Sequence, residues 1–254
     1  MFSLQGKHAF ITGGSQGIGL AVARRYRQAG AEVTLTDIAD GTTVAAEIGA
    51  RFLRLDVSDE GATAAALDAT VSAGGTLDVV VLNAGIGDVG QPITQVDSVA
   101  LERMTRINQW GVLYGLKHAP TRMKDGGSII ATSSLAAIVN MPGSVAYSAA
   151  KRAVLAMIEM AALELGARGI RANAVCPGYV ATAMGSGEEG EALARTMTAL
   201  GRVATTDDLV GVYHFLATDE SSYVTGQAIR VDGGWTAGAS PALLTRVIGA
   251  GHVS

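Results

Sequence analysis

The sequence has few of the features that mark secreted, membrane or metal-binding proteins. The chain of 254 residues has one cysteine, Cys176, so no intrachain disulfide can form, and we expect an intracellular location. The N-terminus lacks a charged-then-apolar signal pattern, and no apolar run reaches the roughly 18 residues of a membrane span. These absences predict a soluble, cytoplasmic protein with no membrane partner.

Clusters of positive charge and of metal-ligating side chains are also missing. The formal net charge is −4 and the lysines and arginines form no runs, which argues against a nucleic-acid surface. The four histidines are scattered without the spacing of metal ligands, so we expect no metal site. Glycine is abundant, with 33 residues, and 48% of the chain is hydrophobic. This composition fits closely packed helices on a buried sheet.

Short apolar runs alternate with longer helical patterns along the chain. The predicted strands are residues 7–12, 32–36, 51–55, 77–82, 127–132, 170–176 and 227–231. Helical patterns lie between them, at about 17–29, 41–48, 59–73, 97–120, 145–167 and 206–217. Strands that are nearly continuous hydrophobic runs are typical of a parallel sheet buried on both faces. We predict one α/β domain over residues 1–254, with a Rossmann-like, doubly wound sheet of seven parallel strands between helices.

The segment SLAAIVNMPGSVAYSAAK carries the most specific chemical pattern. If the part that begins near Tyr147 is helical, Lys151 lies one turn further on the same face. A lysine charge about 4 Å from a phenol, at an effective dielectric near 20, stabilises the phenolate by about 4 kcal/mol, which lowers the pKa from about 10 to about 7. Tyr147 can then act as a general base or acid, with Ser134 hydrogen-bonded to the same substrate oxygen. The alternative is a chance meeting on an ordinary helix.

A glycine-rich turn, TGGSQGIG, follows the first predicted strand and opens the first predicted helix. Gly13, Gly17 and Gly19 allow a tight turn and let the backbone approach a pyrophosphate, which the free N–H groups of a helix N-terminus attract. The spacing differs from the common G-x-G-x-x-G fingerprint, and glycine also marks ordinary turns. The position between strand and helix favours a dinucleotide site.

Asp37 ends the second predicted strand, at the place where a dinucleotide site holds the ribose of the adenosine. A carboxylate there accepts both ribose hydroxyls and repels a 2′-phosphate, which favours NAD over NADP. Neither Ser15 and Gln16 in the glycine loop nor Ile38 after the acid supplies the cation that a 2′-phosphate needs. The alternative is a solvated loop aspartate.

Taken together, the motifs resemble those of the short-chain dehydrogenase/reductase family, in its single-domain form of about this length. The likeness covers residues 4 to about 234. It consists of TGGSQGIG, Asp56-Val57, Asn83-Ala84-Gly85, Asn108 in RINQWG, Ser134, Tyr147-x-x-x-Lys151, and Pro177-Gly178 with Thr182. The combination, in this order and at compatible spacing, is highly specific.

The resemblance implies how a dinucleotide would be held. Asp56 would bond the adenine amino group with the Val57 backbone beside the ring, although Asp56 or Ser58 can instead cap the next helix. Asn83 to Gly85 would line the pocket beside the adenosine ribose and stabilise the sheet, unless they form a plain turn. The glycine loop and the loop after the sixth strand would supply the other contacts, from Ser15, Gln16, Ile18, Pro177, Gly178, Val180 and Thr182.

For catalysis, the resemblance implies hydride transfer between nicotinamide C4 and a secondary carbinol carbon, with Tyr147 as base or acid and Ser134 orienting the oxygen. Lys151 would also bind the nicotinamide ribose. Asn108 would distort the helix over 97–120 and hold a water in a proton relay to Lys151. An asparagine inside a helix is otherwise mildly unfavourable.

The substrate is less determined by the sequence. Asn140 lies in AIVNMPG, which resembles segments of some polyol- and sugar-oxidising members, and its amide can bind a second hydroxyl; it can equally cap a turn before Met141-Pro142. A polyol or sugar is the favoured class. The stretch 183–200 is predicted to be a mobile lid. Further pocket candidates are Tyr179, Met184, Asp88 and Gln91.

The helix that begins near Tyr147 carries apolar residues around nearly its whole circumference, with Glu159 and Glu164 as the main exceptions. A helix on a sheet needs one apolar stripe, so we predict a partner surface and a homo-oligomer. The resemblance implies a tetramer. The tail over 235–254 either covers a neighbouring subunit or frays.

Three functions are compatible with these residues. An NAD-dependent alcohol dehydrogenase is favoured because every chemical position is filled and Asp37 selects the cofactor, and the usual cellular NAD balance favours the direction of alcohol oxidation. A 3-oxoacyl thioester reductase of the same family normally prefers NADPH, against which Asp37 argues. A sensor or scaffold that binds NAD without turnover would be indicated by loss of Tyr147 or Lys151, and both are present.

Overall fold

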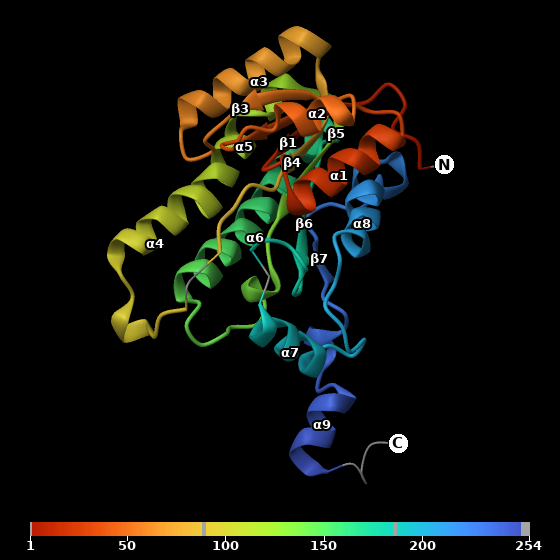
Figure 1. Ribbon diagram of the computed structural model, residues 1–254. Coiled ribbons are helices and arrows are strands. Elements are labelled where there is room, and N and C mark those ends of the chain that lie inside the picture. Colours follow the sequence, from red (N-terminus) through yellow and green to blue (C-terminus); the bar gives the residue numbers. More distant parts are fainter. Residues whose placement is uncertain (1, 88–89, 185–186, 250–254) are drawn as a thin grey trace.

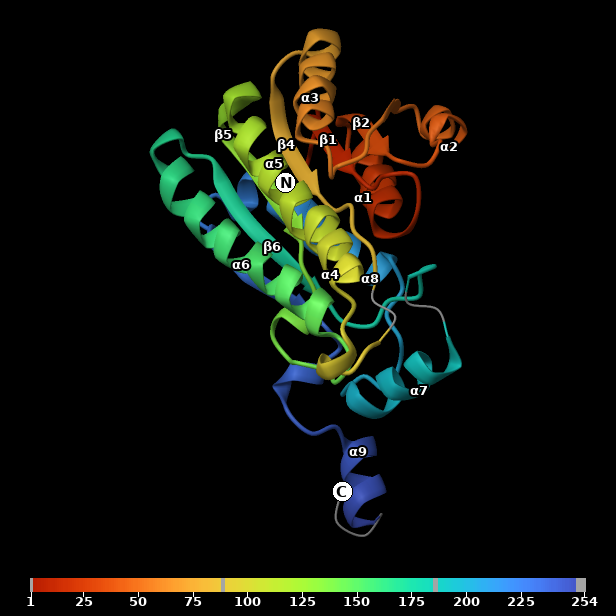
Figure 2. The same cartoon turned by 90° about the vertical axis from the view of Figure 1, so that its left-hand side faces the viewer.

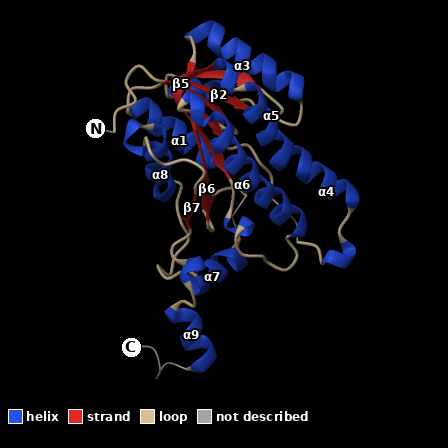
Figure 3. Ribbon diagram, turned by 180° about the vertical axis from the view of Figure 1, so that it is seen from behind, coloured by secondary structure: helices blue, strands red, loops and turns tan. Residues whose placement is uncertain are grey.

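The computed structural model describes residues 2–87, 90–184 and 187–249. Within them, seven strands form one sheet in the order β3-β2-β1-β4-β5-β6-β7, and every neighbouring pair is parallel. The predicted doubly wound parallel sheet is confirmed, with helices on both sides of the strands (Figure 3). The strands are β1 (His8–Thr12), β2 (Glu32–Asp37), β3 (Arg51–Arg54), β4 (Leu77–Leu82), β5 (Met123–Thr132), β6 (Arg171–Pro177) and β7 (Ala228–Val231).

The helices follow the predicted alternation, with two differences. The predicted helix over 97–120 contains two α-helices joined by a π-helical turn, Arg106–Trp110. Short helices also form in the predicted lid and tail, where α9 packs on α7 and extends beyond it (Figure 1). The helices are α1 (Gly17–Gln28), α2 (Thr42–Glu47), α3 (Glu60–Gly74), α4 (Ser98–Thr105), α5 (Gly111–His118), α6 (Val145–Leu165), α7 (Glu188–Met197), α8 (Asp207–Ala217) and α9 (Pro241–Ile248). No helix among the described residues is long and apolar enough to cross a membrane.

Alternate residues of the central strands pack on opposite faces of the sheet. In β4, Val80 and Leu82 face one core, while Val79 and Val81 face the other. The first core includes side chains of α3, α5 and α6, which lie together on the side turned to the viewer in Figure 2, and the second includes those of α1 and α8. Each fully buried aliphatic side chain contributes roughly 1.5–3 kcal/mol, so this alternation explains why the strands are continuous hydrophobic runs.

The strand order reverses between β1 and β4. These strands are neighbours in the sheet, although β2 and β3 come between them in sequence. At such a reversal the connections leave toward opposite faces, and a crevice opens beyond the carboxyl ends of the strands. The glycine loop follows β1 and Asn83 follows β4, so the fold places both at this crevice.

Candidate active site

A cavity of about 630 Å³ lies beyond the carboxyl ends of the strands. It brings together nineteen of the predicted site residues, from segments far apart in the chain: Gly13, Gln16, Gly17, Ile18, Asp37, Asp56, Val57, Asn83, Ala84, Gly85, Ser134, Tyr147, Lys151, Pro177, Gly178, Tyr179, Val180, Thr182 and Met184. Five other predicted residues are not part of its lining: Ser15, Gly19, Gln91, Asn108 and Asn140. Asp88 lies outside the described residues.

Steric contacts explain the glycines of the first loop. A Cβ on Gly19 would lie 2.1 Å from the carbonyl oxygen of Gly13, so only glycine lets helix α1 start this close to the end of β1. A Cβ on Gly13, where φ is +63°, would lie 2.8 Å from Cα of Ala84. Gly19 therefore shapes the loop without lining the cavity. The residues present fit a dinucleotide, because this close-packed turn exposes a helix N-terminus to the cavity.

The carboxylate of Asp37 connects β2 to the glycine loop. One of its oxygens accepts hydrogen bonds from the hydroxyl and the backbone N–H of Ser15, and the other accepts from the N–H of Ala39 at 3.1 Å. Ser15 thus contacts Asp37 rather than the cavity. The acid lines the cavity and holds the loop in place through these bonds.

Asp56 lines the same end of the cavity, and it does not cap the next helix. Its Oδ1 accepts from the N–H and hydroxyl of Ser58, at 2.9 and 2.8 Å. The N-cap of α3 is Asp59, whose side chain accepts from the N–H of Ala62 at 2.9 Å. The alternative in which Asp56 or Ser58 caps this helix is therefore wrong, because Asp59 is the N-cap and the helix begins at Glu60.

Asn83 fastens the glycine loop to two strands. Its Nδ2 donates to the carbonyls of Thr12 and Gly13, at 3.2 and 3.1 Å, while its Oδ1 accepts from the hydroxyl of Thr132 at 3.0 Å. The backbone N–H groups of Asn83 and Ala84 both donate to the Thr12 hydroxyl. The predicted structural role of Asn83 is confirmed by these bonds, which exclude a plain turn.

Ser134 and Tyr147 meet at the opposite end of the cavity from Asp56. The Ser134 hydroxyl follows β5, and a hydrogen bond joins it to the phenol of Tyr147 in the first turn of α6. Burial raises the pKa of Tyr147, and the bond to Ser134 opposes this with a smaller lowering effect. Desolvation penalises the charged form of the phenol, so the phenolate at neutral pH stays a prediction.

Lys151 is buried beside Tyr147. Its Nζ donates to the carbonyl oxygen of Thr132 at 2.9 Å and lies 5.9 Å from the centre of the Tyr147 ring. Burial lowers the pKa of Lys151 to about 8. The predicted neighbourhood of the phenol and the ammonium is confirmed, although the ammonium charge acts across a gap rather than through a direct bond.

Asn108 lies in the π-helical turn between α4 and α5. Its side chain is fully buried and pairs with the backbone of Ile86, accepting from the N–H at 2.8 Å and donating to the carbonyl at 2.9 Å. A Cβ on Gly85 would lie 2.7 Å from Asn108 Oδ1 and 3.3 Å from Lys151 Nζ, so both groups converge on Gly85. The helix distortion at Asn108 is confirmed, and the proton relay stays a prediction.

Comparisons with known proteins agree with this geometry. A family model described as "Enoyl-(Acyl carrier protein) reductase" matches residues 13–236. "Cis-4-hydroxycyclohexanecarboxylate dehydrogenase" of Sinomonas cyclohexanicum is 39% identical over 240 residues, which are 90% of this chain and 96% of that protein. The chain belongs to the short-chain dehydrogenase/reductase family. It is an oxidoreductase of a family that binds a nicotinamide cofactor.

Two further members illustrate the range of the family. "(+)-borneol dehydrogenase 1" of Salvia officinalis is 36% identical over 249 residues, 92% of this chain and 95% of that protein. The crystal structure of a blue fluorescent protein from a metagenomic library, in complex with NADPH, has a TM-score of 0.87 and 35% identity, covering 92% of this chain and 99% of that one. These similarities do not by themselves distinguish NAD from NADP.

The lining of this cavity includes a group of large apolar side chains. They were not selected by sequence reasoning: Ile86 packs in a cluster with Tyr147, and Leu135, Met141 and Trp235 share a second cluster. Asn140, the predicted polar contact, is exposed and is not part of the lining, while its neighbour Met141 is. No local signal in the sequence distinguishes these two neighbours, because the direction of each side chain depends on how the loop packs.

The described part of the predicted lid is a helix packed against part of this lining. α7 shares an apolar cluster with Leu135, Tyr179 and Trp235, to which it contributes Ala194 and Met197. Gly190 in α7 lies against the ring of Tyr179, since a Cβ there would overlap the phenol. α7 thus packs against residues that line the cavity, and its role as a mobile lid stays a prediction.

Two cavity residues on the α4 side were also not predicted from the sequence. Arg103 in α4 and Ile107 in the π-helical turn both line the cavity and stand one turn apart. Helical spacing places them on one face, but the sequence does not show which face looks into the site. Arg103 adds a positive charge to a lining that otherwise includes Lys151, Asp37 and Asp56.

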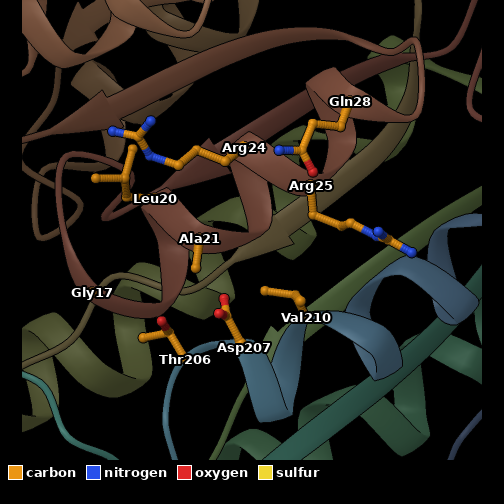
Figure 4. Close-up of a pocket in the computed structure, with 9 residues that line it drawn as sticks. All are labelled: Gly17, Leu20, Ala21, Arg24, Arg25, Gln28, Thr206, Asp207 and Val210. Atoms are coloured by element: carbon orange, nitrogen blue, oxygen red, sulfur yellow. The ribbon is translucent and has the colours of Figure 1, made fainter.

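A second hollow of about 490 Å³ lies between α1 and α8, and it shares Gly17 with the first. Figure 4 shows the side chains of Arg24 and Arg25 pointing in different directions there, with Asp207 between the two helices. None of the predicted catalytic side chains lines it. The cavity around Tyr147 is therefore the candidate active site.

Proposed function

We propose that this protein interconverts a secondary alcohol carried on an apolar ring and the corresponding ketone, with NAD(H) as cofactor. The observation that carries the proposal is that Ser134, Tyr147 and Lys151 line the same cavity as the glycine loop. A proton-transfer group and a dinucleotide cradle in one cavity are what hydride transfer to or from a carbinol carbon requires.

The side chains have distinct tasks in this reaction. When bound, a nicotinamide supplies or takes up the hydride at its C4 carbon. The phenol of Tyr147 gives its proton to the ketone oxygen in reduction, and the phenolate takes the proton of the alcohol in oxidation. Ser134 donates a hydrogen bond to the same oxygen and fixes its direction. The charge of Lys151 stabilises the phenolate across the gap described above.

The choice of NAD rests on Asp37. Its carboxylate lines the adenosine end of the cavity, as does Asp56, and a 2′-phosphate placed there would face two negative charges. Ser15, which donates to Asp37, and Gln16 are both uncharged, so the loop contributes no cation to offset these two negative charges. We therefore propose NAD, although the fluorescent-protein relative was crystallised with NADPH.

The apolar walls support a ring-bearing substrate over a polyol. The polyol expectation depended on Asn140, which is exposed outside the lining. Relatives named for hydroxycyclohexanecarboxylate and borneol act on hydroxyls attached to rings. A carboxylate on the substrate would have Arg103 as a counter-ion in the same cavity. We propose an alicyclic alcohol, with or without a carboxylate, as the substrate class.

The outer face of α5 and α6 supports self-association. Leu113, Met160 and Leu163 are 43%, 54% and 78% exposed on these adjacent helices (Figure 2). Burying such side chains against a second copy stabilises the assembly. We propose a homo-oligomer built on this face, a tetramer by family resemblance, and light scattering on the eluted protein measures its mass.

The decisive experiment follows the absorbance of reduced nicotinamide with purified protein. We expect turnover of cyclohexanol- or borneol-type alcohols with NAD, weaker turnover with NADP and none of acyclic polyols. Tyr147→Phe should abolish turnover while keeping NADH binding. Reduction of a 3-oxoacyl thioester with NADPH alone would contradict the proposal and support the thioester-reductase alternative.

A further inference from the structure

A chain of hydrogen bonds runs from helix α8 to the glycine loop. The hydroxyl of Tyr213 in α8 lies 2.7 Å from the hydroxyl of Thr132 at the end of β5. Thr132 donates to Asn83 Oδ1 at 3.0 Å, and Asn83 Nδ2 donates to the carbonyl of Gly13 at 3.1 Å. Hydrogen bonds thus link four residues from separate segments one after another, from helix α8 through β5 to the glycine loop.

The donors in this chain can be assigned. The single proton of the Thr132 hydroxyl is used toward Asn83, so Tyr213 must be the donor in the Tyr213–Thr132 bond. Burial raises the pKa of Tyr213, which keeps its hydroxyl protonated. The bond to Thr132 also sets the Asn83 amide with its oxygen toward β5 and its nitrogen toward the loop. Each link therefore has one direction.

Thr132 is the branch point of the arrangement. Its hydroxyl is hydrogen-bonded to both Tyr213 and Asn83, and its main-chain carbonyl accepts from Lys151 Nζ at 2.9 Å. Tyr213 is fully buried and does not line the cavity. Its hydroxyl reaches the cofactor loop by way of Thr132.

We propose that Tyr213 is a positioning residue for the cofactor: through Thr132 and Asn83 it holds the Gly13 turn in the shape that receives the dinucleotide. This inference rests on the proposed function, because it concerns the same nicotinamide site. Without the hydroxyl of Tyr213, the Thr132 side chain can rotate, and its hydroxyl no longer donates steadily to Asn83 Oδ1. The Asn83 amide then holds the Gly13 carbonyl less firmly. The result is weaker dinucleotide binding with the proton-transfer group unchanged.

Tyr26 offers a matched control. It is also a fully buried tyrosine in the same core, and its hydroxyl donates to the main-chain carbonyl of Tyr213 at 2.8 Å. Tyr26→Phe removes one buried hydrogen bond, as Tyr213→Phe does, but it breaks no link toward Asn83. A loss of binding that follows only from general destabilisation would appear in both variants.

The test compares the dissociation constant of NADH, measured by its fluorescence on binding, with kcat and with the melting temperature. Tyr213→Phe should raise the constant about 3- to 10-fold, the range that corresponds to one buried hydrogen bond, while kcat changes less than about twofold. Tyr26→Phe should leave binding at the wild-type value. Thr132→Val should weaken binding, Thr132→Ser should restore it, and adding Tyr213→Phe to Thr132→Val should have no further effect.

The outcomes separate this inference from the proposed function. If the wild-type protein binds NADH and Tyr213→Phe binds it equally well, the positioning role is wrong and the proposed function stands. Equal losses in Tyr213→Phe and Tyr26→Phe, or additive losses with Thr132→Val, would also overturn it. A wild-type protein that binds no dinucleotide contradicts both proposals.

Discussion

The ammonium of Lys151 lies 5.9 Å from the centre of the Tyr147 ring and donates its hydrogen bond elsewhere, to the carbonyl of Thr132. The lysine therefore affects the phenol through its charge. Burial raises the pKa of Tyr147 and lowers that of Lys151. A positive charge at this distance favours the phenolate over the phenol when the lysine is protonated.

Removing the charge should shift the pH dependence of alcohol oxidation. Lys151→Met should move the rising limb of kcat to higher pH, by on the order of one to two pH units, because the phenolate loses a favourable interaction. Lys151→Arg keeps the charge and should shift the limb less. A pH–rate profile of each variant measures the effect, and a limb that stays at the wild-type pH in Lys151→Met would contradict it.

Gly19→Ala should prevent cofactor binding. The added methyl would lie 2.1 Å from the carbonyl oxygen of Gly13, so the turn between β1 and α1 must open. Gly211→Ala is the control, because a Cβ there meets nothing within 4 Å and α8 continues on both sides. The control should stabilise the fold by about 0.4–1 kcal/mol in urea unfolding and keep NADH binding. Normal NADH binding by Gly19→Ala would show that the turn is not the cradle.

Asp37→Asn should reduce the preference for NAD. The substitution keeps the shape and an acceptor for Ser15 but removes the charge that repels a 2′-phosphate. We expect the ratio of kcat/KM for NAD to that for NADP to fall about tenfold or more, which corresponds to about 1.4 kcal/mol. Asp40→Asn is the control, since Asp40 lies in the same loop and bonds Thr42 outside the lining. Equal changes for both cofactors would contradict selection by Asp37.

Arg103→Ala should discriminate among substrates by charge. Arg103 lines the cavity, whereas Arg106 on the next turn contacts Glu102 at 3.7 Å and the Trp110 ring. We expect KM for a ring alcohol with a carboxylate to rise about tenfold in Arg103→Ala, with KM for a neutral ring alcohol unchanged. Arg106→Ala should change neither. A rise in KM for the cofactor instead would place Arg103 beside the dinucleotide.

The protein should lose stability in mild acid through His214. Arg25 Nε donates to His214 Nδ1 at 3.0 Å, and burial, followed by the charge of Arg25, lowers the pKa of this imidazole. The unfolded chain then binds a proton more readily, so stability is full above about pH 6.5 and falls as the pH decreases toward the lower folded-state pKa. Urea unfolding at pH 8 and pH 5.5 measures the loss. His214→Gln should lose less unfolding free energy than the wild type between pH 8 and pH 5.5. If the variant and the wild type lose the same amount, groups other than His214 cause the loss.

Short-range patterns predicted much of the site. The glycine turn between a strand and a helix, and the one-turn spacing of Tyr147 and Lys151, are local relationships that survive in the fold. The π-helical turn around Asn108 was expected only by resemblance, since no periodicity in the sequence shows an extra residue in a helical turn. The N-cap at Asp59 was missed because three residues that can cap a helix lie within four positions, and hydrogen bonding decides among them.

The sequence by itself determined the order of strands and helices, the dinucleotide turn and the pairing of phenol with ammonium, because each depends on neighbours within a few turns of the chain. The tertiary structure alone decided that Met141 rather than Asn140 lines the cavity, that burial raises the pKa of Tyr147, and that Tyr213 in α8 meets Thr132 of β5. These properties depend on which distant segments pack together and how much water they exclude. Spacing along a chain carries no information about either.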